Sequence, residues 1–437
     1  VLSIIKKTVE ILTSFTFINH GYSLTGIFED QVRMLSSNVH EVHLFVCENF
    51  EADDEAKLFE HDPWTHLNFT LHKVIPKTDL VDYQREEDLS EHHKEIIRMT
   101  GEVLASKLTW LQIDIVFTHD FLLTGWNLPY GLGVMDCCTR SSTHKIAWFH
   151  WIHSLPNPRK DWWVIRKWGS RHKLVYPNKT DLQKIIEAYW GAASCAIAIP
   201  HIKDYRSYFE FGEDTYNFID EFPGVMESEI VMVYPASTDR LDAKRVDKLI
   251  AIFKEFKRMK FKVCLVIANQ WATGRARKQD ITVYYKRVRL SKLKINKEVI
   301  FTSEWKDEFA TGIPRRLLRE LQLMSNLFIF PTSHESFGLV AHEAALCGVE
   351  MVYNRSLTMM HEVSGGQGIH AEFGSYEKEL VTPGTEKEYY EALAHLIAGR
   401  MQRNESISCK TFNRLAYNWD RVYNKFYLPA FGESDLW

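Results

Sequence analysis

The sequence lacks several features that would each have indicated a particular class of protein. It contains no run of about 18 consecutive apolar residues, so no membrane-spanning helix is expected. Its seven cysteines are scattered and suggest neither a metal site nor a disulfide framework, which favours a reducing, intracellular setting. The net charge is only −4, which neither demands nor excludes a polyanionic partner.

Two local motifs are also missing. No Asp-x-Asp metal motif stands in a convincing loop, and the nearest candidate, Asp53-Asp54, lies in a charged stretch. Residues 1–13 are too charged for the apolar part of a secretory signal, and we expect them to form an amphipathic element, a core-facing helix rather than a membrane anchor. The missing Asp-x-Asp motif favours a protein that works without a bound metal.

What is present is an alternation of strand-like and helix-like segments over 437 residues, 45% of them hydrophobic and 25% charged, which suits two ordinary domains. A strand at 14–19, a loop at 20–26, a helix near 27–36 and a strand at 41–46 would form a βαβ opening. The remaining predicted strands of the two sets lie at 113–118, 145–149 and 193–199, then at 230–235, 263–267, 299–301, 327–330 and 350–353.

Two successive sets of parallel strands predict an α/β protein with two Rossmann-like domains that face a cleft. We place the domain boundary near Phe222-Pro223-Gly224, which gives domains at 1–223 and 224–415. The aromatic-rich tail, 416–437, is predicted to be helical.

The most informative stretch places two carboxylates, Glu335 and Glu343, eight residues apart around a Ser-Phe-Gly turn. Residues 327–331 read as a buried strand, and 339–347 read as a helix that ends before Gly348. A strand, a turn and a helix N-terminus can bind a phosphate, because backbone N–H groups and the positive end of the helix dipole point at it. The carboxylates suit hydroxyl groups instead, and a nucleotide sugar carries both kinds of group.

The full string Ser-x-Glu-Ser-Phe-Gly-Leu, followed by Glu-Ala-Ala-Leu-Cys-Gly, resembles the donor-site signature of the retaining GT-B glycosyltransferases. The likeness is to the large sucrose-synthase and mannosyltransferase-like family 4, whose two glutamates have this EX7E spacing. The resemblance implies a GT-B fold whose C-terminal helix crosses back to the first domain. It also implies that Glu335 contacts the donor sugar, Glu343 the ribose, and the segment Ser336, Phe337, Gly338 and Leu339 the diphosphate.

Arg240 and Lys244 follow the first strand of the second predicted domain. Two cations at a strand-to-helix junction can clamp a diphosphate. The segment resembles the family's Arg…Glu-Lys-Gly pattern, in which arginine and lysine hold the donor diphosphate. It is one residue shorter and has Arg245 where glycine is usual, so Arg245 could replace or supplement Lys244.

His150 ends a predicted parallel strand, where a side chain can point toward a ligand. The resembling family has a histidine near the transferring sugar at this place. His150 matches it best and His153 is the rival, while Trp151 stands where related enzymes often have an acidic residue. Gly21 and Gly26 are the counterparts of the family's glycine loop on the donor, although the usual adjacent Gly-Gly pair is missing.

Residues 158–173 combine six Lys or Arg residues and three tryptophans with one Asp. Positive charge with stacking surface suits a nucleic-acid strand or a lipid headgroup region, and a basic helix with buried tryptophans is the alternative. In the resembling fold this domain receives the acceptor. The candidate acceptor-binding residues are therefore His153, Arg159, Lys160, Trp162 and Arg166.

These motifs predict a retaining transfer of a sugar from a nucleotide-diphosphate sugar to an acceptor hydroxyl, with no cofactor and no metal. The residues assigned to catalysis are His150, Glu335, Arg240 and Lys244. The acceptor would be a glycan, a lipid-linked sugar or a small metabolite. Two alternatives stay open: a DNA-base-modifying glycosyltransferase, and a non-catalytic scaffold that binds nucleotide sugars. We expect a cytoplasmic protein, with peripheral membrane contact left open.

Overall fold

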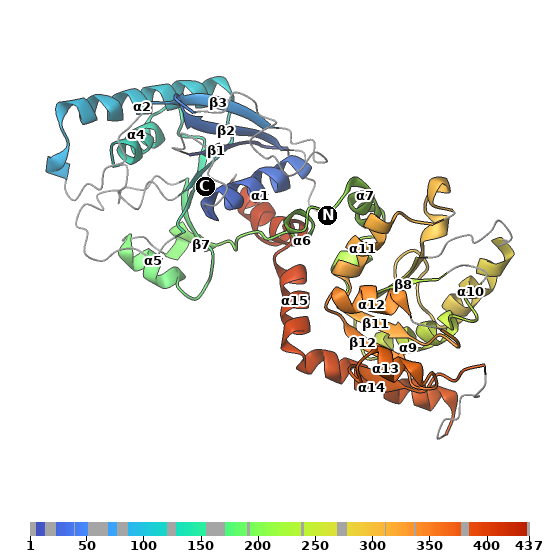
Figure 1. Ribbon diagram of the computed structural model, residues 1–437. Helices are drawn as coiled ribbons and strands as arrows, with labels where there is room; N and C mark the ends of the chain where they lie inside the picture. The colour runs from blue at the N-terminus through green and yellow to red at the C-terminus, as the bar shows by residue number, and fades with distance from the viewer. Residues whose placement is uncertain are drawn as a thin grey trace. The chain divides into compact units, whose positions relative to one another are not determined.

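The computed structural model describes residues 6–13, 23–38, 40–50, 69–76, 86–119, 128–153, 171–189, 193–236, 240–268, 278–310, 312–335, 338–376 and 384–434. The chain forms two compact units, and each is described here by itself. The first unit contains residues 1–204 and 417–437, and the second contains residues 205–416 (Figure 1). None of the described helices is both long enough and apolar enough to cross a membrane.

The first unit is built on a parallel sheet with the strand order β3-β2-β1-β4-β5-β6-β7, in which the order reverses beside β1. Its strands are β1 Thr8–Leu12, β2 Glu41–Cys47, β3 Phe69–Ile75, β4 Ile115–His119, β5 Ala147–Trp151, β6 His172–Tyr176 and β7 Ala196–Ala198. Its longer helices are α1 Ser23–Ser37, α2 Glu91–Trp110, α4 Leu128–Thr139 and α5 Leu182–Ala188.

Helices cover both faces of this first sheet. Buried residues of α2, α4 and α5 form one core with the sheet. On the other face lies the end of the chain, as α16 Trp419–Val422, a π-helical turn at Tyr423–Tyr427 and α17 Leu428–Ser434. Phe117 of β4 contacts the rings of Tyr427 and Phe431, and Gln31 of α1 donates a hydrogen bond to the Tyr427 hydroxyl at 2.9 Å. The C-terminal tail therefore completes the core of the first unit.

The N-terminal segment differs from its sequence prediction. Residues 8–12 form the central strand β1, paired with β2 and β4, and not an amphipathic helix. Glu10 is completely buried in this strand although its side chain is ionisable. The predicted strand at 14–19 lies outside the described residues, and Gly26 lies within helix α1 instead of in a loop.

The second unit contains two three-stranded parallel sheets, β10-β9-β8 and β11-β12-β13. They meet at β8 and β11, where the Asn326 amide donates to the Val231 carbonyl at 3.1 Å and Asn326 Oδ1 accepts from the Val231 amide at 2.9 Å. The strands are β8 Ile230–Pro235, β9 Val263–Ala268, β10 Val299–Phe301, β11 Leu327–Phe330, β12 Glu350–Asn354 and β13 Ile369–Ala371. The strand order thus reverses between β8 and β11.

Helices cover both faces of the second sheet because successive strand residues point to opposite sides. Met232 and Tyr234 belong to a core with α9 and α14, whereas Val231 and Val233 belong to a core with α7, α8 and α11. The helices are α6 Tyr205–Tyr208, α7 Glu213–Glu221, α8 Gly224–Glu227, α9 Val246–Arg258, α10 Lys278–Leu290, α11 Arg315–Met324, α12 Leu339–Leu346, α13 Met359–Val363, α14 Glu386–Arg403 and α15 Glu405–Ala416.

The two units confirm the predicted α/β class with two Rossmann-like sheets. The division between them falls at residues 204 and 205, whereas the sequence placed it near Phe222-Pro223-Gly224. Residues 205–223 belong to the second unit because Phe218 and Phe222 pack in its core. This contact depends on tertiary packing, which the Pro-Gly pair in the sequence did not reveal.

Candidate functional site

The candidate site of the second unit lies at the carboxyl ends of β8 and β11, the two strands between which the strand order reverses. In open α/β sheets, ligands bind outside the carboxyl ends of the strands at such a point. The loop after β8 carries Arg240 and Lys244, and the loop after β11 carries Glu335. The fold therefore brings together side chains that are about 90 positions apart in the sequence.

A direct ion pair joins these two loops. Lys244 Nζ donates to Glu335 Oε2 at 2.9 Å, and both side chains are largely buried, with exposed fractions of 16% and 21%. The ammonium also lies 5.5 Å from the centre of the Phe330 ring. Ser333 strengthens the junction, because its amide and its hydroxyl both donate to the Ala243 carbonyl at 2.9 Å.

Tyr234 of β8 holds the loop that carries Lys244 in place. Its hydroxyl donates to the Lys244 carbonyl at 3.1 Å. Burial raises the pKa of Tyr234, and the Glu335 carboxylate raises it further. The phenol therefore stays protonated and acts as a hydrogen-bond donor that fixes the backbone carrying Lys244.

The next element is the N-terminus of α12. Gly338 begins this helix with φ of 83°, in the left-handed region that glycine adopts without strain. A side chain there would meet Phe330 at 3.1 Å and Met360 at 3.3 Å. The first N–H groups of a helix have no acceptor within the helix, so this end can accept an anion. Ser336 and Phe337 lie outside the described residues.

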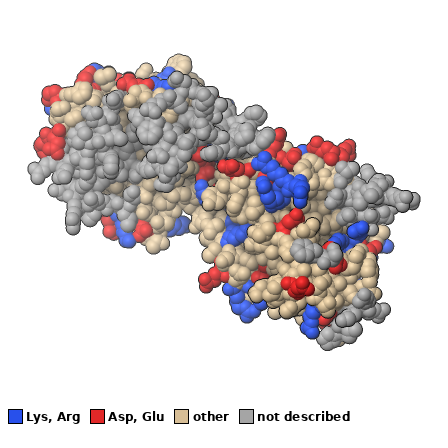
Figure 2. Space-filling model, in the orientation of Figure 1, with Lys and Arg blue, Asp and Glu red and all other residues tan. Residues whose placement is uncertain are grey.

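Glu343 lies on α12, and its carboxylate is 3.9 Å from the guanidinium of Arg315 at the start of α11. Arg315 is not among the site residues predicted from the sequence. Basic side chains gather over α11 in Figure 2, and this helix carries the exposed residues Arg315, Arg316 and Arg319. The pair Arg315-Arg316 directly after Pro314 was the available signal, because proline commonly precedes or opens a helix.

Arg240 and Arg245 adopt positions that the sequence left undecided. Arg240 is exposed, at the end of the loop after β8. Arg245 has φ of 54°, which explains why the resembling family has glycine at this place. Lys244, and not Arg245, forms the ion pair with Glu335.

The histidines of the first unit are buried in hydrogen-bonded groups. His150 is completely buried in β5, and its two ring nitrogens lie 2.8 Å from Thr118 Oγ1 and 2.8 Å from His172 Nδ1. Burial lowers its pKa well below the usual value, and the neighbouring His172 lowers it further, so the ring is neutral. Its predicted contact with a sugar stays a prediction.

His153 lies in a second chain of imidazoles. Its ring nitrogens are 2.9 Å from His119 Nδ1 and 3.4 Å from His201 Nε2. Burial, followed by the nearby His201, lowers the pKa of His153 to about 3. Several other predicted residues of this unit, Gly21, Arg159, Lys160, Trp162 and Arg166, lie outside the described residues.

A known protein family matches most of the second unit. Residues 224–408 match the family described as glycosyl transferases group 1, and this match supports glycosyl transfer as the function. No curated protein matches the chain.

Similar solved structures include a glycosyltransferase from Rickettsia africae ESF-5, with 11% identity, a TM-score of 0.38 and coverage of 98% of each chain. Sucrose-phosphate synthase from Thermosynechococcus elongatus shows 15% identity and a TM-score of 0.34, over 98% of this chain and 100% of that one. A trehalose 6-phosphate synthase from Burkholderia multivorans shows 12% identity and a TM-score of 0.34, over 98% and 99%.

Proposed function

From the family match of residues 224–408, we propose that this chain is a retaining glycosyltransferase whose second unit binds a nucleotide-diphosphate sugar. The observation that carries the proposal is the Lys244–Glu335 ion pair, beside the N-terminus of α12 and at the reversal of the strand order. A cation and a helix N-terminus suit the diphosphate of such a donor, and two carboxylates suit the hydroxyls of its two sugars.

In the proposed mechanism the diphosphate leaves as an anion. Lys244 and Arg240 stabilise its developing negative charge together with the first N–H groups of α12. Glu335 accepts hydrogen bonds from hydroxyls of the transferring sugar, and Glu343 accepts them from the ribose. The acceptor hydroxyl attacks the anomeric carbon on the face from which the diphosphate leaves and gives its proton to the departing phosphate oxygen, so the configuration at the anomeric carbon is retained. No metal is required for these roles.

A donor panel tests this proposal. The thermal midpoint of the purified protein is measured with UDP-, GDP- and ADP-sugars, with and without EDTA. We expect one nucleotide class to raise the midpoint, and the rise to persist in EDTA. The matched variant Glu343→Ala should show a much smaller rise at the same donor concentration. A folded wild-type protein that responds to none of these donors would contradict donor binding.

The stereochemistry has a separate test. When no acceptor is supplied, water can take its place, and the anomer of the released sugar is read by proton NMR before it equilibrates. Retention predicts that the first sugar detected has the same anomeric configuration as the donor. The opposite anomer would contradict the retaining mechanism while leaving donor binding intact.

A further inference from the structure

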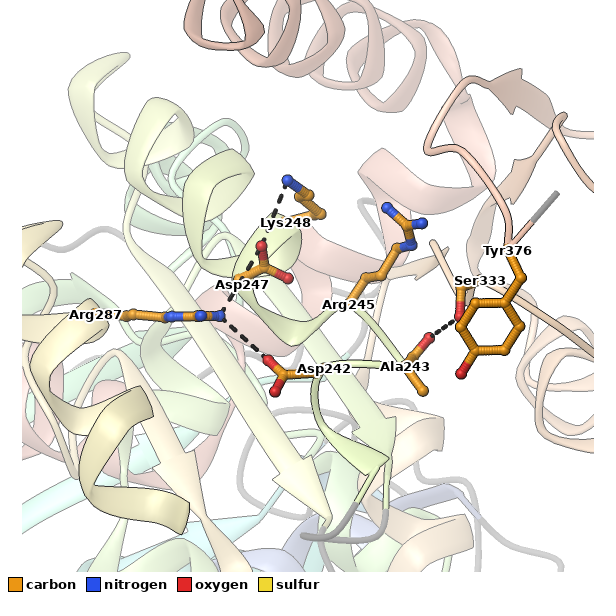
Figure 3. A pocket seen from close by; sticks show the side chains of 8 residues that line it. All are labelled: Asp242, Ala243, Arg245, Asp247, Lys248, Arg287, Ser333 and Tyr376. Carbon is orange, nitrogen blue, oxygen red and sulfur yellow. Dashed lines mark hydrogen bonds and ion pairs between the residues drawn. The ribbon is translucent and has the colours of Figure 1, made fainter. Parts of the chain in front are cut away.

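A polar pocket lies in the second unit, at the N-terminus of α9. Its volume is about 360 Å³, within the range of about 300–1,000 Å³ that small-ligand pockets occupy. It is lined by Arg245 and Lys248 of the α9 N-terminus, Arg287 of α10, Ser333 after β11 and Tyr376 after β13 (Figure 3). Asp242 and Asp247 also line it.

Two of the three cations are already paired with carboxylates. Lys248 contacts Asp247 at 3.4 Å and also contacts Glu386. Arg287 lies 3.6 Å from Asp242 and 4.0 Å from Asp247. These pairs form one wall of the pocket, and they leave little free positive charge on that side.

Arg245 is different. Within the described part of the chain its guanidinium forms no hydrogen bond and no ion pair within 4.0 Å, and its charge acts only at longer range on Glu386, the carboxylate that Lys248 contacts directly. Its Nε is buried without a hydrogen-bond partner among the described residues. In Figure 3 its side chain extends between Lys248 and Tyr376, and no dashed line reaches it. Its backbone adopts a left-handed conformation, with φ of 54° and ψ of 45°, which is unfavourable for a residue with a side chain. The unsatisfied buried donor beside a pocket points to a ligand that accepts a hydrogen bond from Arg245.

The chemistry of the lining defines the ligand. An unpaired guanidinium beside a helix N-terminus suits a phosphate, which it can bind with two parallel hydrogen bonds. Asp242 and Asp247 disfavour a compound with several phosphates because of like-charge repulsion. Carboxylates do, however, accept hydrogen bonds from hydroxyl groups. We propose that this pocket binds a sugar monophosphate, with its phosphate on Arg245 and its hydroxyls toward the aspartates.

The position of the pocket connects it to the donor site. Arg245 directly follows Lys244, and Ser333 precedes Glu335 by two residues on the loop that it ties to Ala243. A ligand held by Arg245 and Ser333 therefore touches both loops that carry the Lys244–Glu335 pair. The bound sugar monophosphate is either the acceptor or an effector of the transfer reaction. Binding itself does not depend on the proposed function, but the acceptor role does.

The test is calorimetric titration of the full-length protein, without nucleotide, with glucose 1-phosphate, glucose 6-phosphate and mannose 6-phosphate. Glucose and inorganic phosphate serve as comparison ligands. We expect at least one sugar monophosphate to bind more tightly than either comparison ligand. Arg245→Gly should weaken this binding at least about tenfold, because it removes the guanidinium. This variant should still fold, since glycine suits the positive φ.

A matched control is Arg289→Ala, which removes an exposed arginine two residues after Arg287, outside the pocket. It should bind the sugar monophosphate like the wild type. The proposal is overturned if no sugar monophosphate binds the wild type, or if Arg245→Gly binds it equally well. It is also overturned if Arg245→Gly loses UDP or GDP binding to the same extent, because Arg245 would then belong to the donor site.

The role of the ligand is read by adding the donor. If the sugar monophosphate is consumed and its glycosylated product appears, with the new sugar on one of its hydroxyls, the pocket holds the acceptor. If it changes the rate of donor turnover and is recovered intact, the pocket holds an effector. A wild-type protein that binds sugar monophosphate but no nucleotide would contradict the proposed function and would leave this pocket assignment standing.

Discussion

Lys244 Nζ lies 2.9 Å from Glu335 Oε2, so the cation proposed to hold the donor diphosphate is paired with the carboxylate proposed to contact the donor sugar. The pair ties together the two loops that carry these residues. Preorganised charges of this kind stabilise a transition state without the cost of reorganisation during the reaction.

This pair leads to the first prediction. Glu335→Gln and Lys244→Ala should each lower kcat by roughly 100-fold, the order of magnitude for the loss of one charge-stabilising group. Because the residues are in contact, the double variant should lose much less than the product of the two single losses. Steady-state kinetics with the donor found in the panel measures this, and Lys286→Ala, an exposed lysine of α10, is the control. Independent, multiplying losses would show that the pair does not act as a unit.

Glu343→Ala should raise the KM for the donor by about tenfold or more and change kcat little. The carboxylate is proposed to bind the ribose, which does not react, so its contribution is equal in the ground state and the transition state. Its side chain is 42% exposed, so the thermal midpoint without ligand should stay close to that of the wild type. A fall in kcat with an unchanged KM would argue against ribose binding.

Arg240→Ala should act in the opposite way and mainly lower kcat. Its guanidinium is proposed to meet the charge that develops on the diphosphate as the bond to the sugar breaks. Arg240→Lys should recover part of the rate because it keeps the charge without the bidentate geometry. The measurement is kcat and KM for the donor in both variants. An Arg240→Ala enzyme with wild-type kcat would show that Arg240 does not take part in the mechanism.

Glu10 is expected to destabilise the first unit at neutral pH. Among the residues that the structure describes, neither of its buried carboxylate oxygens has a hydrogen-bond partner, and burial raises its pKa well above the usual 4.5. The folded state keeps a proton that the unfolded chain has lost, so the stability contributed by this group falls as the pH rises from about 4.5 through the folded-state pKa.

Glu10→Met should therefore increase the free energy of unfolding at pH 8 by about 1–3 kcal/mol and reduce this pH dependence. Guanidinium denaturation at pH 6 and pH 8 measures both effects. Glu10→Gln removes the ionisation but keeps a polar group. It should reduce the pH dependence as well, but it should increase the free energy of unfolding at pH 8 by less than Glu10→Met. A Glu10→Met protein less stable than the wild type at pH 8 would contradict the prediction.

The imidazole chain of the first unit predicts a loss of stability in acid. Burial lowers the pKa of His153 to about 3 and that of His201 to about 4, from the usual 6.5. The unfolded chain takes up these protons first, so the stability present above pH 6.5 is lost as the pH falls from 6.5 toward 4.

His153→Gln should show a smaller loss over this range, because an amide can also donate and accept a hydrogen bond but does not titrate. The thermal midpoints of the wild type and of His153→Gln are compared between pH 7 and pH 4.5. Glu10 becomes more stabilising as the pH falls, but it contributes equally to both proteins and does not affect the difference. His92→Gln, at an exposed position of α2, should follow the wild type. If His153→Gln loses stability as steeply as the wild type, His153 is not the source of the acid sensitivity.

Local patterns in the sequence predicted most strands of the second unit to within a residue or two. The segments 230–235, 299–301 and 327–330 are continuous apolar runs, and they form β8, β10 and β11. The turn before α12 was recognisable because Gly338 stands between a strand and a helix. Such features depend on neighbouring residues, which the sequence displays directly.

The first unit was harder to predict. Its central strand β1 contains Glu10, and a charged residue in the middle of a buried strand contradicts the pattern expected of a core. The short strand β7 was predicted too long, because its first predicted residues, Ala193–Cys195, form a 3-10 turn instead. The chain of His119, His153 and His201 joins residues from separate strands and loops, so no spacing in the sequence indicates it.

By itself the sequence determined the α/β class, because strand, turn and helix signals are local, and it supplied the residues that are proposed to form the donor site. Only the tertiary structure decided that Lys244 pairs with Glu335 and that Arg315 lies beside Glu343. It also decided that Arg245 lines a pocket of its own. The reason is that the strand order, set by packing of the whole sheet, brings β8 and β11 together although nearly 100 residues separate them.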